Sequence, residues 1–264
     1  MIPSRIALLT LPSVISDAAS LAAMRLLGPR LVLLGLSDPM RPAAGGVLGQ
    51  LRRRIGQSGP RILPYLALGY GLPGRAGRLR HTAAAIGAPS AAVADVNGAA
   101  FRDMLAAARP DLIVTLHFDQ ILADETLALA PKGGVNLHPS LLPAHRGPIP
   151  AFWALAEGGA GAGVSLHRMV ARIDAGTVLA QRRVALPPGI SALAAARLLH
   201  LEGVGLLASL VAGGLPETDA PAAAPRPYCG FPDAMTLRAS GVTLVAWRDW
   251  GLALGAAGRG PEAP

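Results

Sequence analysis

Residues 134–147 read Gly-Val-Asn-Leu-His-Pro-Ser-Leu-Leu-Pro-Ala-His-Arg-Gly and predict a strand that ends in a loop fixed by prolines. Asn136 and His138 are two residues apart, so on a strand their side chains point to the same face. Pro139 has no backbone N–H to donate and therefore ends the pairing of that strand. An amide and an imidazole thus lie side by side where a strand stops. In an open α/β sheet this is the place where ligands bind.

The sequence before this stretch predicts an α/β fold, because short apolar runs of strand length alternate with stretches of helical period. The expected strands are residues 5–10, 31–36, 91–94, 111–116 and 134–138, and the clearest helices between them are 13–27 and 99–108. This order predicts a Rossmann-like, doubly wound, mostly parallel sheet. The first turn, residues 10–13, lacks the glycine-rich sequence of dinucleotide sites and gives no support for NAD or ATP binding.

The sequence after this stretch predicts two further strands and a long helix. The expected elements are a helix at 151–156, strands at 163–169 and 178–186, and a helix at about 191–212. Pro187-Pro188-Gly189 marks a boundary. We therefore divide the chain into residues 1–189, which hold the predicted site, and a C-terminal part, residues 190–264. The second part is expected to hold the long helix, a Pro/Ala linker at 216–227 and a short helical or β extension.

The composition predicts a soluble globular protein. Of the 264 residues, 52% are hydrophobic and 15% are charged, which suits a packed core. The single cysteine, Cys229, excludes a disulfide within the chain and a metal cluster held by cysteines. The longest apolar run, residues 203–216, is shorter than the roughly 20 residues of a membrane-spanning helix. We expect a cytoplasmic protein with no stable membrane insertion.

The charge is unevenly distributed along the sequence. The formal net charge is +8, and no acidic residue lies between Asp38 and Asp95. The arginines in that interval are Arg41, Arg52, Arg53, Arg54, Arg61, Arg75, Arg78 and Arg80. Such a basic segment can meet the phosphates of a nucleic acid, a nucleotide or a membrane surface, and it can equally be a solvated face of the protein.

The same region, residues 39–87, is long for a connection within one β–α–β crossover. Residues 48–55 predict a short basic helix, and residues 62–72 form an apolar stretch with two tyrosines. A lid, a partner surface and an amphipathic piece that touches a membrane are all compatible with this pattern. The plainest interpretation is an inserted helical pair that covers one edge of the sheet.

Three linked motifs, in order over residues 110–190, resemble the folate-dependent formyltransferase family. They are Asn136-x-His138-Pro-Ser-Leu-Leu-Pro143-x-x-Arg146-Gly147 with a following Trp153, then Gly163-Val-Ser-Leu-His167, then Asp174-Ala-Gly176 with Ala180-Gln181. Members of this family use 10-formyltetrahydrofolate and include methionyl-tRNA, glycinamide ribonucleotide and nucleotide-sugar formyltransferases. The resemblance implies the formyltransferase fold for the first part of the chain.

The resemblance places the catalytic trio of the family on Asn136, His138 and Asp174, and the chemistry agrees. Moving a formyl group to an amine passes through a carbon that bears an oxyanion. An asparagine N–H and a protonated histidine can donate hydrogen bonds to that oxygen. A histidine beside a carboxylate can also relay the proton that the amine loses, through a water held by Asp174. No metal is needed.

The resemblance also implies the binding residues. The folate contacts of the family fall on Phe118, Gln120, Ile121, Leu122, Val170 and Ile173, and the substrate loop falls on Ser140, Leu141, Pro143, Arg146 and Gly147. The Leu142–Pro143 bond is a candidate for the cis form. Taken singly, these residues have plainer interpretations. Asn-x-His can be a satisfied strand end, and Asp174 can be a turn former. Four further histidines, His117, His145, His167 and His200, are interpreted as surface or supporting residues.

The acceptor is predicted to be a primary amine of a small molecule, such as an amino sugar nucleotide. Residues 10–13 do not match the phosphate loop of the glycinamide ribonucleotide enzymes, and residues 166–176 are closer to the sugar-nucleotide enzymes. The tRNA enzymes carry a C-terminal β-barrel domain, whereas residues 190–264 predict a helix and a linker. Methionyl-tRNA formyltransferase-type activity, favoured by the basic segment, stays open as an alternative. So does a non-catalytic relative that binds folate or RNA.

Overall fold

A computed structural model describes residues 2–38, 41, 45–71, 75–215 and 226–255 of the protein. Its strands are β1 (Ile6–Thr10), β2 (Leu31–Ser37), β3 (Ser90–Val93), β4 (Leu112–Leu116), β5 (Gly134–His138), β6 (Gly163–Arg168) and β7 (Val178–Arg183). They form one sheet in the order β3-β2-β1-β4-β5-β6-β7. The first five strands are parallel to one another, and β6 is antiparallel to β5 and β7. The predicted Rossmann-like, doubly wound, mostly parallel sheet is confirmed.

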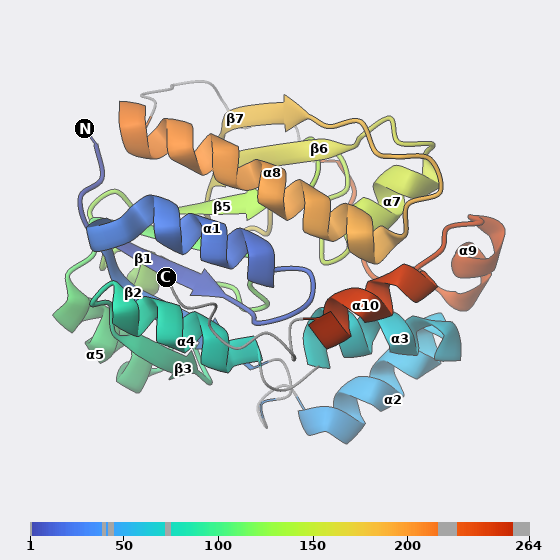
Figure 1. Ribbon diagram of the computed structural model, residues 1–264, viewed down its shortest axis with the longest axis horizontal. Coiled ribbons are helices and arrows are strands. Elements are labelled where there is room, and N and C mark those ends of the chain that lie inside the picture. Colours follow the sequence, from blue (N-terminus) through green and yellow to red (C-terminus); the bar gives the residue numbers. More distant parts are fainter. Residues whose placement is uncertain (1, 39–40, 42–44, 72–74, 216–225, 256–264) are drawn as a thin grey trace.

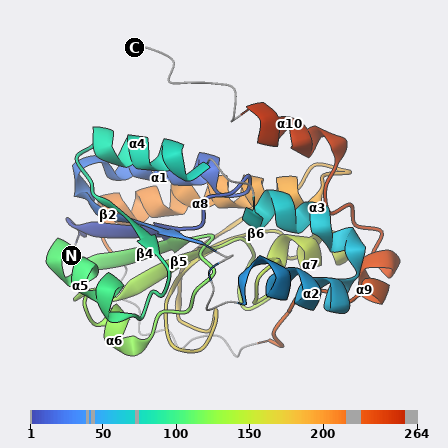
Figure 2. The ribbon, with the colours of Figure 1, turned by 90° about the horizontal axis from the view of Figure 1, so that it is seen from below.

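Helices cover both faces of this sheet (Figures 1 and 2). The longer ones are α1 (Asp17–Leu27), α2 (Gly46–Ser58), α4 (Arg75–Ala85), α5 (Ala99–Ala108), α7 (Pro150–Ala156), α8 (Ala192–Gly213), α9 (Ala234–Ala239) and α10 (Trp247–Gly255). The short ones are η1 (Gly28–Arg30), η3 (Pro60–Ile62), α3 (Leu63–Leu66), η4 (Ala67–Gly71) and α6 (Asp124–Leu127). Helices α1, α4 and α8 share one hydrophobic cluster with the sheet, and α5 and α6 share another.

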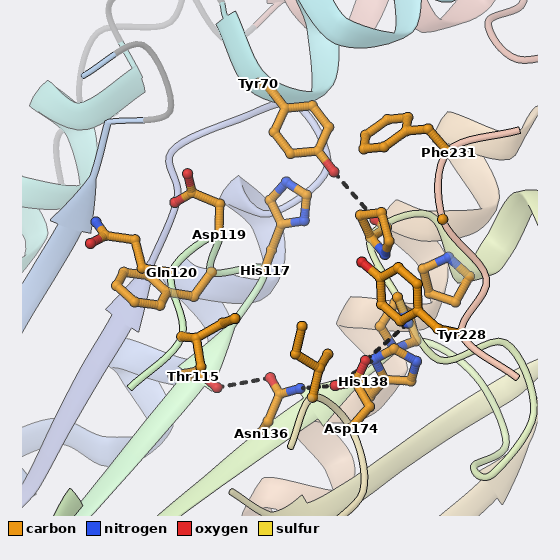
Figure 3. Close-up of a pocket in the computed structure, with 18 of the residues that line it drawn as sticks. Tyr70, Thr115, His117, Asp119, Gln120, Asn136, His138, Asp174, Tyr228 and Phe231 are labelled. Atoms are coloured by element: carbon orange, nitrogen blue, oxygen red, sulfur yellow. Dashed lines mark hydrogen bonds and ion pairs between the residues drawn. The ribbon is translucent and has the colours of Figure 1, made fainter. Parts of the chain in front are cut away.

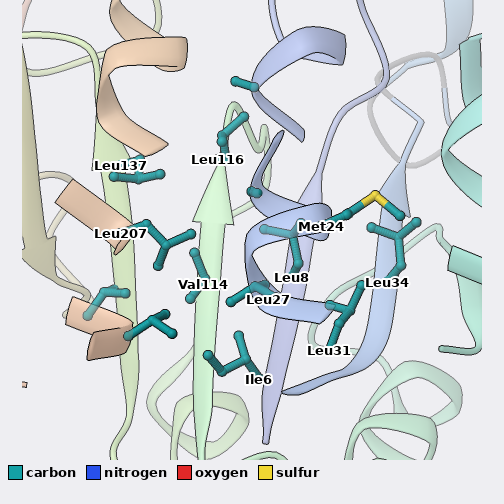
Figure 4. Close-up of a cluster of buried hydrophobic side chains, with 14 of the residues drawn as sticks. Ile6, Leu8, Met24, Leu27, Leu31, Leu34, Val114, Leu116, Leu137 and Leu207 are labelled. Atoms are coloured by element: carbon teal, nitrogen blue, oxygen red, sulfur yellow. The ribbon is translucent and has the colours of Figure 1, made fainter. Parts of the chain in front are cut away.

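The central strand β1 shows why its sequence is a continuous apolar run. Ile6 and Leu8 point to the cluster under α1, which Figure 4 shows, while Ala7 and Leu9 point to the cluster under α5. A strand that is buried on both faces has no side left for polar residues, so its sequence does not alternate. All four side chains are fully buried.

Helix α8 belongs to the helical layer of the sheet, although the division predicted at residue 189 places it in the C-terminal part. It packs on β5, β6, α1 and α7. Its start is capped by Ser191, whose hydroxyl oxygen accepts a hydrogen bond from the N–H of Ala194 at 3.0 Å. By length and composition α8 could span a membrane, but half of its most apolar window is buried inside the protein.

The C-terminal extension is helical where the structure describes it. Residues 226–255 contain α9 and α10 and no strand, so of the predicted helical or β extension this described range is helical. The carbonyls of Thr243 and Leu244 instead accept hydrogen bonds from the N–H groups of Ala192 and Leu193, at 2.8 and 3.1 Å. These are donors of the first turn of α8, which has no partner of its own for them. The linker predicted at 216–227 falls mostly outside the described residues.

The inserted segment does not cover a sheet edge as its plainest interpretation predicts. Helices α2 and α3 lie beyond the carboxyl ends of the strands, on the side toward which the β1 arrow points in Figure 1. Helix α4 packs on α1 and on β2 and β3. Ile62, Tyr65 and Leu68 are fully buried, so the apolar residues of this stretch belong to the core. A membrane-touching role for them is therefore wrong, because their side chains already pack inside the protein.

The core predicts a large effect of truncation at Leu8. Leu8→Ala removes a fully buried side chain between β1 and α1, so we expect the free energy of unfolding to fall by about 2–5 kcal/mol. The matched control is Leu48→Ala in α2, where the side chain is 83% exposed and the change should stay within about 0.5 kcal/mol. Urea denaturation followed by circular dichroism measures both. Equal losses in the two variants would contradict the packing described above.

Candidate active site

Polar side chains of three neighbouring strands stand in one row across the sheet. Thr115 of β4 is opposite Asn136 of β5, and Asn136 is opposite His167 of β6. The Thr115 hydroxyl donates to Asn136 Oδ1 at 2.8 Å, and Asn136 Nδ2 donates to His167 Nε2 at 3.1 Å. His167 Nδ1 donates to the carbonyl of Arg168 at 2.8 Å, which leaves Nε2 as the acceptor. The row therefore fixes the orientation of the Asn136 amide.

Asp174 reaches this row from the turn after β6. Its backbone is left-handed, with φ of 48°, a conformation that aspartate adopts more readily than most residues. One carboxylate oxygen accepts the N–H of Gly147 at 3.0 Å. The other lies 3.5 Å from Asn136 Nδ2, 3.6 Å from His138 Nδ1 and 3.6 Å from His167 Nε2. The structure thus brings the three predicted catalytic residues together (Figure 3).

The charges of His138 and Asp174 follow from burial and from each other. Burial lowers the pKa of His138, against the carboxylate of Asp174, which raises it. Burial would raise the pKa of Asp174, but His138, His167 and the Gly147 N–H outweigh it and bring the pKa to about 2. At neutral pH the pair is therefore a neutral imidazole beside a carboxylate. His138 Nε2 donates to the carbonyl of His145 at 3.1 Å, so Nδ1 is the bare nitrogen that faces Asp174.

The loop after β5 is held from below by two strand residues that the sequence motifs contain. The Ser165 hydroxyl donates to the carbonyl of Ser140 at 2.6 Å and accepts the N–H of Leu142 at 3.0 Å. Gln181 Nε2 donates to the carbonyl of Leu142 at 2.7 Å and to Ser165 Oγ at 2.8 Å. The predicted cis bond between Leu142 and Pro143 is present. The motif residues Ser165 and Gln181 therefore shape the loop.

Most of the predicted substrate loop turns away from the cavity, which corrects that prediction. Gly147 lines the cavity, whereas Ser140, Leu141, Pro143 and Arg146 do not. The Ser140 hydroxyl donates to the carbonyl of Ala144 at 2.8 Å, and the Leu141 side chain packs beside Gly163. The Arg146 guanidinium donates to the carbonyls of Ile173 and Arg226. These side chains serve the loop itself, because its backbone needs partners once prolines interrupt the strand.

A cavity of about 620 Å³ lies above the catalytic trio. The residues predicted to contact folate all line it: Phe118, Gln120, Ile121, Leu122, Val170 and Ile173. The side chain of Gln120 is already engaged, since its Nε2 donates to Ser37 Oγ at 2.9 Å and to the carbonyl of Val93 at 2.8 Å. Its Oε1 accepts the N–H of Val96 at 2.9 Å. Gln120 therefore fixes its loop, and the neighbouring side chains offer an apolar slot.

Sequence reasoning did not single out Thr115, and it interpreted four histidines only as surface or supporting residues. Thr115 and His167 act on Asn136 directly, and only the pairing register of β4, β5 and β6 places them there. His117 and His200 line the cavity with their rings 5.3 Å apart, so neither is a surface residue. His145 is buried and contacts Glu157 at 2.9 Å. The sequence did indicate that Ser165 and His167 share one face of a strand, because they are two residues apart.

The sequence model of a family described as formyl transferase matches residues 74–209, just over half of the chain. The chain belongs to this family. The matched region contains the catalytic trio and the sheet strands that carry it. The catalytic roles of Asn136, His138 and Asp174 stay predictions.

Solved formyltransferase structures share the fold. Glycinamide ribonucleotide transformylase 1 from Symbiobacterium toebii is 20% identical over 80% of this chain and 86% of its own, with a TM-score of 0.54. A sugar N-formyltransferase from a Shewanella species is 17% identical over 86% of this chain and 77% of its own, with a TM-score of 0.52. An N-formyltransferase from Helicobacter canadensis was solved with folinic acid and dTDP-3-aminofucose. It is 14% identical over 88% of this chain and 71% of its own, with a TM-score of 0.55.

The buried pair predicts the pH dependence of formyl transfer. A base has to be neutral, so activity should fall as the pH drops through the pKa of His138, which burial lowers below the usual 6.5. Asp174→Asn removes the charge that raises this pKa, so the acid limb of log kcat/KM should move to still lower pH. Steady-state rates from about pH 5 to 8 measure the limb. An acid limb that moves to higher pH in Asp174→Asn would contradict the coupling between His138 and Asp174. So would an equal shift in the exposed control His81→Asn.

Proposed function

We propose that the protein transfers a formyl group from 10-formyltetrahydrofolate to a primary amine of a small acceptor, such as an amino sugar nucleotide. The observation that carries the proposal is the convergence of Asn136, His138 and Asp174 on the floor of one cavity. An amide donor, a neutral imidazole and an ionised carboxylate are the groups that this transfer needs.

Asn136 is suited to stabilise the negative charge that develops on the formyl oxygen. One of its N–H bonds is used by His167 at 3.1 Å, and the other makes only a long contact of 3.5 Å with Asp174. That second N–H is the one that can turn to a substrate oxygen. Because Thr115 and His167 hold the amide, little reorganisation is needed when the charge appears.

His138 is suited to take and return one proton. The amine nitrogen forms a bond to the formyl carbon and loses a proton, which His138 Nδ1 can accept. The carboxylate of Asp174, 3.6 Å away, stabilises the imidazolium that results. When the bond between the formyl carbon and the folate nitrogen breaks, the same proton can pass to that nitrogen, directly or through a water held by Asp174. His138 is then neutral again, and the proton count balances.

The cavity suits the folate donor. Phe118, Ile121 and Leu122 come from the loop after β4, and Val170 and Ile173 come from the loop before Asp174. A flat pterin ring fits between two such loops, whose backbone groups can meet its paired donors and acceptors. The Helicobacter canadensis relative was solved with folinic acid, which supports a folate as the formyl donor.

The acceptor is the least constrained part of the proposal. Solved relatives include glycinamide ribonucleotide enzymes as well as sugar N-formyltransferases. Activity on methionyl-tRNA is the second candidate, because arginines of the basic segment line the cavity. A non-catalytic folate or RNA binder is the third, and the complete catalytic trio argues against it. The lone Cys229 supports a cytoplasmic location.

Assay of formyl transfer tests the function. Purified protein with 10-formyltetrahydrofolate and a panel of amino sugar nucleotides, glycinamide ribonucleotide and methionyl-tRNA should release tetrahydrofolate with a sugar nucleotide. Asn136→Ala should lower kcat about 10²–10³-fold because an oxyanion donor is lost. His138→Ala should lower it about 10²–10⁴-fold because the base is lost.

The controls are exposed residues of the same types, His81→Ala and Asp103→Ala, which should keep full activity. Protein that binds folinic acid but releases no tetrahydrofolate with any acceptor would overturn the enzymatic proposal. Full activity of a His138→Ala, Asp174→Ala double variant would overturn the site.

A further inference from the structure

The cavity has a second end, built by two segments that are far apart in sequence. One is helix α2, and the other is the tail segment, which we define as residues 226–231. The N–H of Cys229 donates to the carbonyl of Arg146 at 2.7 Å, and Trp153 Nε1 donates to the carbonyl of Gly230 at 3.0 Å. Gln57 Nε2 of α2 donates to the carbonyl of Phe231 at 2.8 Å. These bonds fix the tail segment between α2 and the loop after β5.

Gly147 allows this close approach. Its backbone has φ of 129°, and a Cβ there would lie 2.3 Å from the carbonyl oxygen of Cys229 and 3.2 Å from the ring of Tyr228. The same glycine holds Asp174 through its N–H. The ring of Tyr228 is 54% exposed and lines the cavity, on the side away from Gln120 (Figure 3). The tail segment is therefore a wall of the reaction chamber.

Helix α2 presents a basic face to this wall. Gln50, Leu51, Arg54 and Gln57 line the cavity at helical spacing, and Arg53 joins them. Arg52 and Arg53 are both exposed, but Arg52 does not line the cavity. The Arg54 guanidinium carbon lies 3.8 Å from the centre of the Phe231 ring. This stacking holds the guanidinium in place at the rim of the cavity.

The positive charge of Arg53 and Arg54 has no counterion within the described residues. Neither forms an ion pair there, although Arg41 in the same cavity pairs with Asp119 at 2.7 Å. Arg54 makes one hydrogen bond to a side chain, to Gln57 Oε1 at 3.3 Å. Burial and the adjacent Arg53 lower the pKa of Arg54. A partly desolvated guanidinium beside a second one is costly until an anion joins them.

We infer that Arg53 and Arg54 bind the phosphate or diphosphate of an acceptor amine, so the acceptor is a nucleoside diphosphate-linked amine. A planar guanidinium matches phosphate oxygens with two parallel hydrogen bonds. The exposed face of Tyr228 offers an aromatic surface on which a nucleobase can stack. Formylation of this ligand rests on the proposed function, whereas its binding rests on the cavity alone. The arginines line a cavity of about 620 Å³, which is within the usual size range of small-molecule sites.

Titration calorimetry with uridine 5′-diphosphate tests the anion site without any reaction. Arg54→Gln and Arg53→Gln should each raise the Kd about 10- to 100-fold, since a charge-assisted hydrogen bond is lost. Arg54→Lys should recover part of the affinity. The matched control is Arg52→Gln, one position away on the same helix, which should bind as the wild type does. Folinic acid affinity should stay unchanged in all variants, which shows that they are folded.

Two results would overturn this site. One is equal binding by all variants, and the other is an equal loss in Arg52→Gln, which would indicate a diffuse basic face. Kinetics separates the site from the proposed function. Arg54→Gln should raise KM for a nucleotide-linked amine and leave KM for 10-formyltetrahydrofolate unchanged. Transfer to amines without phosphate, insensitive to Arg54→Gln, would keep the function and overturn the site.

Two outcomes in the other direction are also decisive. Loss of uridine diphosphate binding in Arg54→Gln without formyl transfer to any amine would keep the site and overturn the function. Transfer to aminoacyl-tRNA alone, sensitive to Arg54→Gln, would overturn the small nucleotide ligand in favour of a nucleic acid phosphate.

Discussion

The hydrogen bond from the Gly147 N–H to the Asp174 carboxylate, 3.0 Å long, joins the two loops on which the site depends. One loop follows β5 and the other follows β6, and the Arg146 side chain reinforces the junction by donating to the carbonyl of Ile173. The bond brings a carboxylate beside Asn136 and His138, and together with His138 and His167, which contribute more, it lowers the pKa of Asp174. Because Gly147 has no side chain, the tail segment can pack against the same loop. Gly147 therefore contacts both the predicted catalytic carboxylate and the tail segment that walls the cavity.

Charge is handled in two ways within this cavity. The Asp174 carboxylate accepts the N–H of Gly147, and Arg41 is paired with Asp119, so each of these charges has a partner within the protein. At the wall built by α2 and the tail segment, Arg54 is held by an aromatic ring and a glutamine amide, neither of which carries a negative charge. Since desolvating a charge costs free energy unless a partner compensates, the two ends differ in what they can accept. Under the proposed function the catalytic end receives a neutral amine and a formyl group, and under the proposed anion site the α2 end receives an anion.

The parts of the fold that could be predicted are those governed by local rules. Strands buried on both faces appear as apolar runs, so β1, β2 and β4 could be located from periodicity alone. Asn136 and His138 could be paired because strand geometry puts alternate residues on one face. Asp174 was reached only through the resemblance to a family, as its turn carries no local signal beyond that of a turn former. The contribution of His167 could not be predicted, because the antiparallel register that sets it opposite Asn136 is decided by the whole sheet.

The sequence by itself determined the α/β class, the strand ends that carry the catalytic pair and the formyltransferase resemblance, because these depend on residue spacing and side-chain chemistry. Only the tertiary structure decided what surrounds the pair. It turned Ser140 and Arg146 inward to serve their own loop, placed α2 over the strand ends instead of a sheet edge, and brought Phe231 under Arg54. The physical reason is that these contacts join segments whose separation along the chain hides them from any local pattern. The stacking of Arg54 on Phe231, and the lack of an ion pair to Arg54 among the described residues, depend on such contacts.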